Sequence, residues 1–237
     1  MAASRTMRSI DDFFNEVRLD VPEVGLPFVR KALMDSCRDF CKRTHIWKEI
    51  KIFSLGALRS EYKLAIHENS FIQDIGYVGR KIDNSSDPVK YSDRTRYKRS
   101  EEDMDEESPN WREQRSAASD FWRWGLLSDR QTFFVSPTPV VALQDGVKAQ
   151  IVLAPNQDAF EVIEILYDEW AEAIGSGASA KLLEVPNKEW TDQKAALMRK
   201  KTFNKAVAAA LRKSTTTKHR VKFRGLGDMS QRSRRTI

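Results

Sequence analysis

The chain has 237 residues, of which 41% are hydrophobic, and a formal net charge of +6. That length allows a packed core without metals or disulfides, and the longest apolar runs fall short of the roughly 18 residues needed to span a bilayer. Residues 1–14, MAASRTMRSIDDFF, lack the order of a signal peptide, so we expect a soluble, intracellularly made protein with no membrane partner.

The net charge is concentrated near the C-terminal end of the sequence. Residues 212–237 contain nine basic residues and a single acid, which gives +8, and the preceding residues carry −2. A near-neutral body with a basic segment differs from a domain with a basic face, because the segment can act as a docking strap for a partner.

Residues 1–47 have a helical pattern. Ser9 and Asp12 resemble a capping box that opens a short helix through DDFFNEV. After the turn DVPEVG, Pro27 suits the first position of a second helix. Apolar and small residues then recur at intervals of three and four up to Thr44, which predicts an amphipathic helix that packs against others.

Residues 48–156 have a β-rich pattern. Short runs of Ile, Val, Phe and Tyr, such as EIKIFSLGAL and AQIVLAP, alternate with Gly, Asn, Asp and Pro. Between them, residues 93–118 combine a basic cluster with the acidic run EEDMDEE, for which we expect a long exposed loop or an irregular excursion.

Helical periodicity returns over residues 157–214. Pro186 disfavours helical geometry at Val185 and ends the first helix there, and Thr191 is the expected N-cap of the last helix, which runs to Ser214. The fold class is therefore α+β: an antiparallel helix bundle, a β-rich insertion, and an extended basic arm over residues 215–237. The bundle core is predicted to contain Leu33, Cys37, Phe40, Leu166, Trp170, Ile174 and Leu183.

Residue types that carry chemistry are sparse. Cys37, Cys41 and His45 lie at helical spacing, but only two other histidines could complete a metal site, so we interpret the cysteines as free, packed thiols. No nucleophile elbow or phosphate-binding loop occurs. We interpret the carboxylates of LYDEWAEA as part of a solvated or subunit-facing surface, in preference to groups for acid–base catalysis. We therefore predict no catalytic residue, cofactor or metal.

The C-terminal arm alternates basic and apolar residues. In an extended strand this alternation separates the two kinds onto opposite sides, which favours strand addition to a partner protein over phosphate binding alone. The candidate docking residues are Arg220, Val221, Lys222, Phe223, Arg224 and Leu226.

Three segments, in order, resemble the head-to-tail adaptor (connector) proteins of tailed bacteriophages. They are VPEVGLPFVRKALMDSCRDFCKRTHIW, SPTPVVALQDGVKAQIVLAP, and the stretch from LYDEW through LLEVPNKEW to the Ala-rich helix. The resemblance covers roughly residues 20–224 and is faint over 60–125. It implies a helix bundle with a β-rich insertion in a structural, non-enzymatic virion protein.

The resemblance also implies the partners. Copies would form a ring, a dodecamer in this family, that docks on the portal protein at the head–tail junction, extends the channel for the genome DNA, and provides the platform for a tail or nozzle protein. The basic arm would reach the portal. The main alternative is a small DNA-binding regulator or packaging factor whose basic tail contacts phosphates, and an enzyme is a more distant one.

Overall fold

The computed structural model describes residues 6–81, 91–92, 97–116, 121 and 123–226, with the backbone alone at residue 92 and from 215 to 226. The chain is a mixed α and β protein, as the sequence predicts. It divides into a β-rich unit, Trp47–Asn156, and a helical unit made of Arg5–Ile46 and Gln157–Ile237. The helical unit therefore draws on both ends of the sequence.

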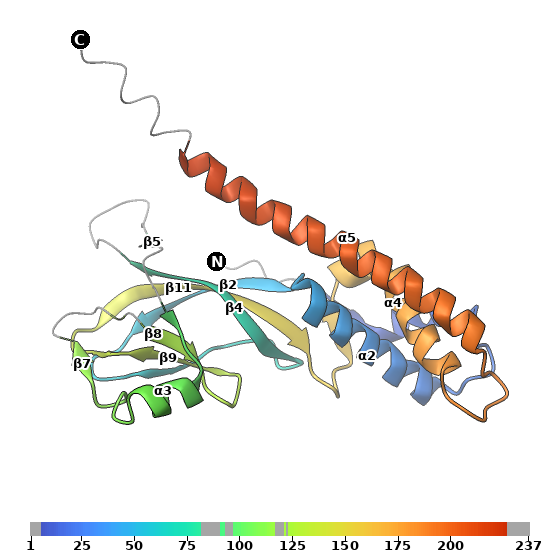
Figure 1. The fold of residues 1–237 in the computed structure, drawn as a ribbon, viewed down its shortest axis with the longest axis horizontal. Coiled ribbons are helices and arrows are strands. Elements are labelled where there is room, and N and C mark those ends of the chain that lie inside the picture. Colours follow the sequence, from blue (N-terminus) through green and yellow to red (C-terminus); the bar gives the residue numbers. More distant parts are fainter. Residues whose placement is uncertain (1–5, 82–90, 93–96, 117–120, 122, 227–237) are drawn as a thin grey trace, which may run out of the picture. The chain divides into compact units, whose positions relative to one another are not determined.

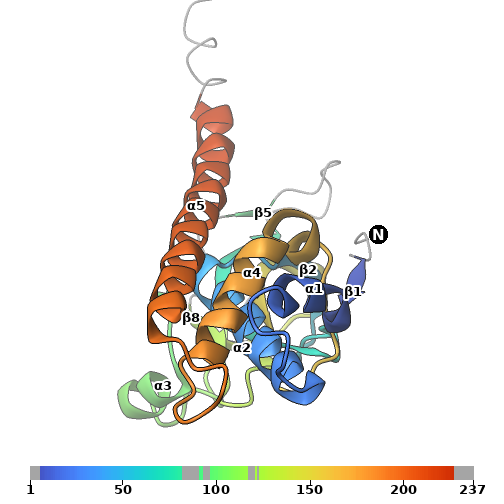
Figure 2. The same cartoon turned by 90° about the vertical axis from the view of Figure 1, so that its right-hand side faces the viewer.

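The helical unit is organised around a central helix, α4. Its elements are β1 (Met7–Ser9), the 3-10 helix η1 (Ile10–Phe13), α1 (Phe14–Arg18), α2 (Leu26–Thr44), β12 (Glu161–Ile163), α4 (Ile165–Leu183) and α5 (Gln193–Leu226). β1 and β12 pair antiparallel. Figure 2 shows α1, α2 and α5 around α4.

Small residues allow α4 to approach its neighbours closely. A Cβ at Gly177 would lie 2.6 Å from the ring of Phe203 on α5 and would also collide with Ser36 on α2. The Ser36 hydroxyl donates a 2.9 Å hydrogen bond to the Ile174 carbonyl. The stretch GSGAS, which weakens an isolated helix, thus stabilises this one through its packing.

The predicted core residues occupy this unit as follows. Six are buried, with at most 5% of their surface exposed: Leu33, Cys37, Phe40, Leu166, Ile174 and Leu183. Trp170 departs from the prediction of a buried core residue, because it is partly exposed. Its ring packs on Phe40 with centroids 5.3 Å apart, and its indole Nε1 is inaccessible, so Trp170 lies at the edge of the core.

The β-rich unit contains two four-stranded sheets. The first has the order β2-β11-β4-β5 and the second β3-β9-β8-β6. The long central strand β11 pairs antiparallel with both β2 and β4. The strands are β2 (Lys48–Leu55), β3 (Glu61–Lys63), β4 (Ser70–Lys81), β5 (Tyr91–Ser92), β6 (Tyr97–Lys98), β8 (Arg123–Leu126), β9 (Thr132–Ser136) and β11 (Leu143–Pro155), and β7 (Arg115–Ser116) pairs with β10 (Thr138–Pro139).

Two successive phenylalanines of β9 join the layers of this unit. Side chains alternate between the faces of a strand, so Phe133 packs against Phe53 of the first sheet, with ring centroids 5.4 Å apart. Phe134 faces the other way and contacts Trp111, with centroids 4.7 Å apart. Met104 of α3 (Glu101–Glu107) completes this outer cluster, and Figure 1 shows α3 against β8 and β9.

The expectation of a long exposed loop over residues 93–118 is wrong for its described part. EEDMDEE forms α3, which begins at a capping box between Ser100 and Asp103. Met104 and Trp111 are fully buried, and the Trp111 indole N–H donates a 2.8 Å hydrogen bond to Asp105. Two apolar anchors and a cap are sufficient to order a segment whose overall composition is charged.

The expectation of an extended arm from residue 215 is also corrected as far as Leu226. α5 is a single helix of 34 residues that continues through the region expected to be strand-like. Extending a helix adds one backbone hydrogen bond per residue, whereas an isolated strand gains none. Residues 227–237 lie outside the described part of the chain.

Candidate functional site

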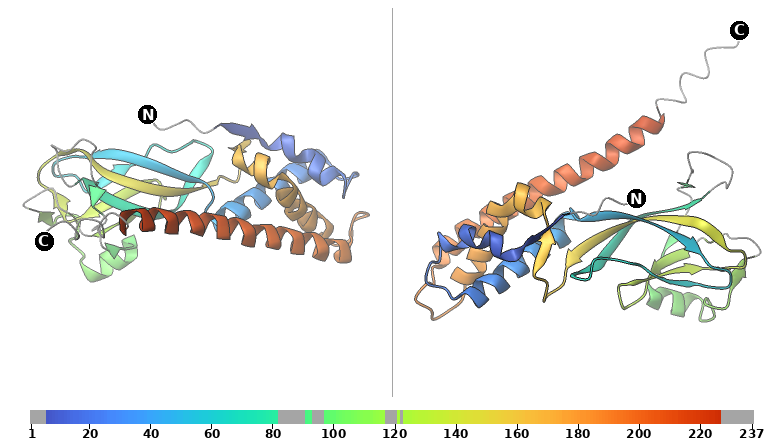
Figure 3. Two further views of the ribbon diagram at one scale, coloured as in Figure 1. Left: turned by 90° about the horizontal axis from the view of Figure 1, so that it is seen from above. Right: turned by 180° about the vertical axis from the view of Figure 1, so that it is seen from behind.

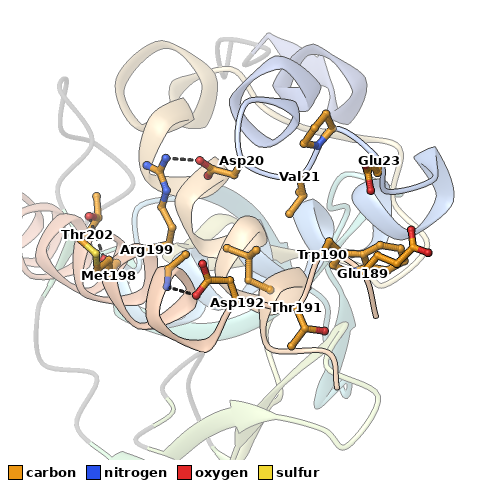
Figure 4. A pocket seen from close by; sticks show the side chains of 13 residues that line it. Asp20, Val21, Glu23, Glu189, Trp190, Thr191, Asp192, Met198, Arg199 and Thr202 are labelled. Carbon is orange, nitrogen blue, oxygen red and sulfur yellow. Dashed lines mark hydrogen bonds and ion pairs between the residues drawn. The ribbon is translucent and has the colours of Figure 1, made fainter. Parts of the chain in front are cut away.

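The helical unit contains a pocket of about 700 Å³ at the N-terminal end of α5. Figure 4 shows that its wall combines the turn after α1, the α4–α5 connection and the first turns of α5. Its lining includes Val21, Glu23, Leu183, Trp190 and Met198. The volume falls in the range of pockets that hold a small molecule or a few side chains.

Local structure in the α4–α5 connection positions the pocket wall. Thr191 was the expected N-cap of α5, but it does not cap the helix. Its hydroxyl instead donates to the Val185 carbonyl at 2.6 Å and accepts from the Lys188 N–H at 3.1 Å. Asp192 is the cap instead, with its carboxylate accepting from the Ala195 N–H at 2.9 Å. These bonds hold the connection against the end of α4.

The pocket has an acidic lining. Its charged residues are the acids Asp20, Glu23, Glu189 and Asp192 and the base Arg199. Arg199 is paired with Asp20, and Asp192 is occupied as a helix cap. Among the described residues, the exposed carboxylates of Glu23 and Glu189 have no ion-pair partner, so they remain available to a cation (Figure 4).

Trp190 gives the pocket an aromatic wall with an unused donor. Its indole Nε1 is inaccessible and has no hydrogen-bond partner within the part of the chain that the structure describes. Lys188 lies over its ring, with Nζ 6.0 Å from the centroid. The ring already attracts a cation from this chain, as expected for the negative face of an indole.

The lining of the pocket combines separate carboxylates with apolar side chains. No group of three or more His, Cys, Asp or Glu side chains in the described residues is arranged to hold a metal ion. The pocket carboxylates instead stand apart around a wall that also contains Val21, Leu183 and Met198. Such a lining suits a side chain that carries both charge and apolar surface, as arginine does.

The opposite end of α5 projects past the helix on which it packs. Lys213 forms an ion pair with Glu169, in the first turns of α4, with Nζ and the carboxylate oxygen 2.6 Å apart. Beyond Lys213, α5 continues to Leu226 (Figures 1 and 3). The predicted docking residues from Arg220 to Leu226 lie on this projecting helix, and their side chains are outside the described set.

The other candidates from the sequence lie apart from the pocket. Cys37 and Cys41 are free, buried thiols on α2, and burial raises the pKa of Cys41 to about 12. His45 ends α2 in the left-handed conformation, with φ of 52°. Asp168 and Glu172 are exposed on α4.

The pocket could not be predicted from the sequence. Its wall comes from two turns, DVPEV and NKEWTD, which lie far apart in the sequence. The tryptophan beside two acids in the second turn was the available signal, but nothing in the pattern shows that the first turn lies next to it.

No protein-family model matches the chain, and no curated protein matches it either. Within the described residues, no helix is both long enough and apolar enough to cross a membrane.

Proposed function

We propose that this protein is a structural head-to-tail adaptor of a tailed bacteriophage, located in the virion at the head–tail junction. The observation that carries the proposal is the ordered resemblance of three segments over roughly residues 20–224. Copies form a ring, dodecameric by that resemblance, which docks on the portal, surrounds the genome DNA and supports the tail or nozzle. The role is assembly, not catalysis.

The helical unit supports this proposal because it is built from segments at both ends of the chain. α2 precedes the β-rich unit, and α4 and α5 follow it. In the proposed family, such helices form the bundle from which the β-rich insertion emerges. The unit also exposes large apolar side chains, with Leu19 at 85% and Phe28 at 63% of their surface. A subunit that joins its neighbours in a ring requires surfaces of this kind.

The projecting end of α5 is the proposed portal-binding arm. It carries Arg220, Lys222 and Arg224 together with Val221, Phe223 and Leu226. The arm docks as a helix, in place of the strand that the alternation suggested, because α5 is helical through Leu226. A helix in a groove uses apolar anchors and peripheral charges.

The test is assembly on the portal. The full chain is mixed with purified portal of the same phage, and native mass spectrometry and electron-microscope class averages are recorded. A ring of this chain on the portal is the expected result. Arg220→Gln with Lys222→Gln and Arg224→Gln should weaken binding, whereas the matched change of three exposed lysines early in α5, Lys194, Lys201 and Lys205, to Gln should not. Absence of any complex would contradict the proposal.

A DNA-binding regulator or packaging factor is the second candidate, favoured by the +8 charge of residues 212–237. Phosphate binding by that segment would release counterions, so affinity for duplex DNA would fall steeply with salt. Measuring DNA binding over a salt series in the absence of portal separates the two functions. Tight, salt-sensitive DNA binding combined with no portal complex would favour this candidate.

A further inference from the structure

We infer that the acidic pocket binds the arginines at positions 232, 234 and 235 of a second copy of this chain. The inference deepens the ring-forming part of the proposed function and rests on it for the closure of the ring. The contact itself concerns two copies of this chain and requires no portal.

The pocket is suited to guanidinium groups. The carboxylates of Glu23 and Glu189 are exposed and form no ion pair among the described residues. Arginine binds carboxylates through two parallel hydrogen bonds and stacks on aromatic faces. Trp190 supplies such a face, and Met198, 64% exposed on the rim, supplies apolar surface for the arginine stem.

The sequence contains a segment of matching charge. QRSRR, residues 231–235, places three arginines within four positions and follows the end of α5 closely. Its single acidic neighbour in residues 227–237 is Asp228. The charge of this segment therefore complements the pocket, which has four acids and one base.

Chain length excludes the same copy as the source of these arginines. α5 begins at the pocket and has 34 residues, so its far end lies about 51 Å away at 1.5 Å per residue. Arg235 is nine residues beyond Leu226, and nine extended residues reach at most about 32 Å. The arginines cannot return to their own pocket along an intact α5, and a second copy is required.

Such a contact joins different surfaces of identical subunits. Each copy offers one pocket and one arginine segment, so each can bind two neighbours, one at each end of α5. Head-to-tail contacts of this kind generate a ring when the rotation closes and a filament when it does not. The contact therefore supplies a physical basis for ring formation.

The experiment measures self-association of the full chain by sedimentation velocity, without portal. Two variants are compared with wild type: the pocket variant Glu23→Gln with Glu189→Gln, and the arm variant Arg232→Gln with Arg234→Gln and Arg235→Gln. Each should weaken association by about tenfold. The matched control is Glu102→Gln with Glu106→Gln on α3, which removes the same charge from exposed acids elsewhere and should leave association unchanged.

Mixing the two variants separates a contact between copies from any effect on folding. The pocket variant retains its arginines and the arm variant retains its pocket, so an equimolar mixture should recover dimers through the one intact contact. Higher oligomers should not return, because the one intact contact is used within the dimer and the pocket and arm left free are both mutated. Recovery of dimers would support the inference, as would greater dissociation of the wild-type chain at high salt.

Several results would overturn the inference. One is a wild-type chain that stays monomeric, and another is a mixture that recovers nothing. If the pocket variant self-associated normally but lost portal binding, the pocket would belong to the portal contact instead. A portal ring that forms normally with both variants would overturn this inference and leave the proposed function standing, whereas self-association without portal binding would do the reverse.

Discussion

Cys37 and Cys41 illustrate how burial controls the chemistry of single residues. Desolvation raises the pKa of Cys41 to about 12 and raises that of Cys37 well above its ordinary value, with the nearby Cys41 adding to the effect. Because the thiolate is the reactive form, only about one Cys41 in ten thousand is reactive at pH 8. We expect neither thiol to react with Ellman's reagent in the native chain and both to react in urea. Rapid native labelling would contradict the burial.

The same pKa shifts predict a pH dependence of stability. The folded-state pKa of each thiol lies above its unfolded value. The contribution of the two thiols to the free energy of unfolding is therefore complete below the unfolded pKa, near 8.5. It is lost as the pH rises from there towards the folded pKa of about 12 for Cys41. The denaturation midpoint of wild type should therefore fall more steeply above pH 9 than that of Cys37→Ala with Cys41→Ala. Parallel curves would show that the thiols do not contribute.

Gly177 lies where α4 packs against both α2 and α5. Alanine there favours the helix by up to about 1 kcal/mol in an open site, but its Cβ would lie 2.6 Å from Phe203. We expect overpacking to dominate and Gly177→Ala to destabilise the protein by about 1–3 kcal/mol in urea denaturation. Gly56→Ala is the control, because its Cβ would meet Arg59 at an ordinary 3.6 Å.

At the scale of elements, α3 depends on one aromatic anchor. Trp111 is fully buried against Phe134, so Trp111→Ala should cost about 3–5 kcal/mol. It should also expose the peptide bonds after Arg112 and Arg115 to trypsin. Arg112→Gln is the comparison for charge, and it also removes the guanidinium that lies 4.2 Å from the centroid of the Trp111 ring. Its ion pairs with Glu101 and Asp105 are exposed at the surface, where such pairs contribute up to about 1 kcal/mol. Similar losses from both changes would mean that charge, not packing, orders α3.

A helix or strand could be predicted from the sequence where the spacing of its apolar residues matches the pattern of its buried side chains. The buried face of α2, with Leu33, Cys37 and Phe40, follows from residues repeated at helical spacing. α3 has a single buried residue, Met104, within its bounds, too few to establish a period. For residues 220–224, alternation favoured a strand, and extension of the preceding helix decided the outcome.

At the scale of the molecule, the pocket marks the limit of sequence reasoning. Val21 and Trp190 belong to turns about 170 positions apart and share one wall only because α4 returns the chain to α2. Composition indicates that each turn is exposed and polar, but their adjacency is a property of packing. The mixed α and β class, in contrast, depends on local patterns along the whole chain and could be predicted.

The projecting end of α5 can be unfolded without affecting the stability of the helical unit, so its helical state can be tested separately. Thr216→Pro removes a backbone hydrogen bond and costs about 3 kcal/mol in a helix interior. The ten residues that follow within α5 are too few to remain helical alone, because isolated helices shorter than roughly 12–15 residues are marginal. We expect a loss of circular dichroism at 222 nm and no shift in the urea midpoint, since α5 has already passed the Glu169 ion pair at Lys213.

Portal binding then distinguishes the two forms of the arm. If the arm docks as a helix, Thr216→Pro should reduce portal affinity, and the control Thr216→Ala, which favours the helix, should retain it. Undiminished binding by the proline variant would indicate that the arm docks in extended form, where positions 221 and 223 share one side. An unchanged dichroism signal would instead show that the segment is not helical in the free chain, and a lowered urea midpoint would show that it packs against the rest of the unit.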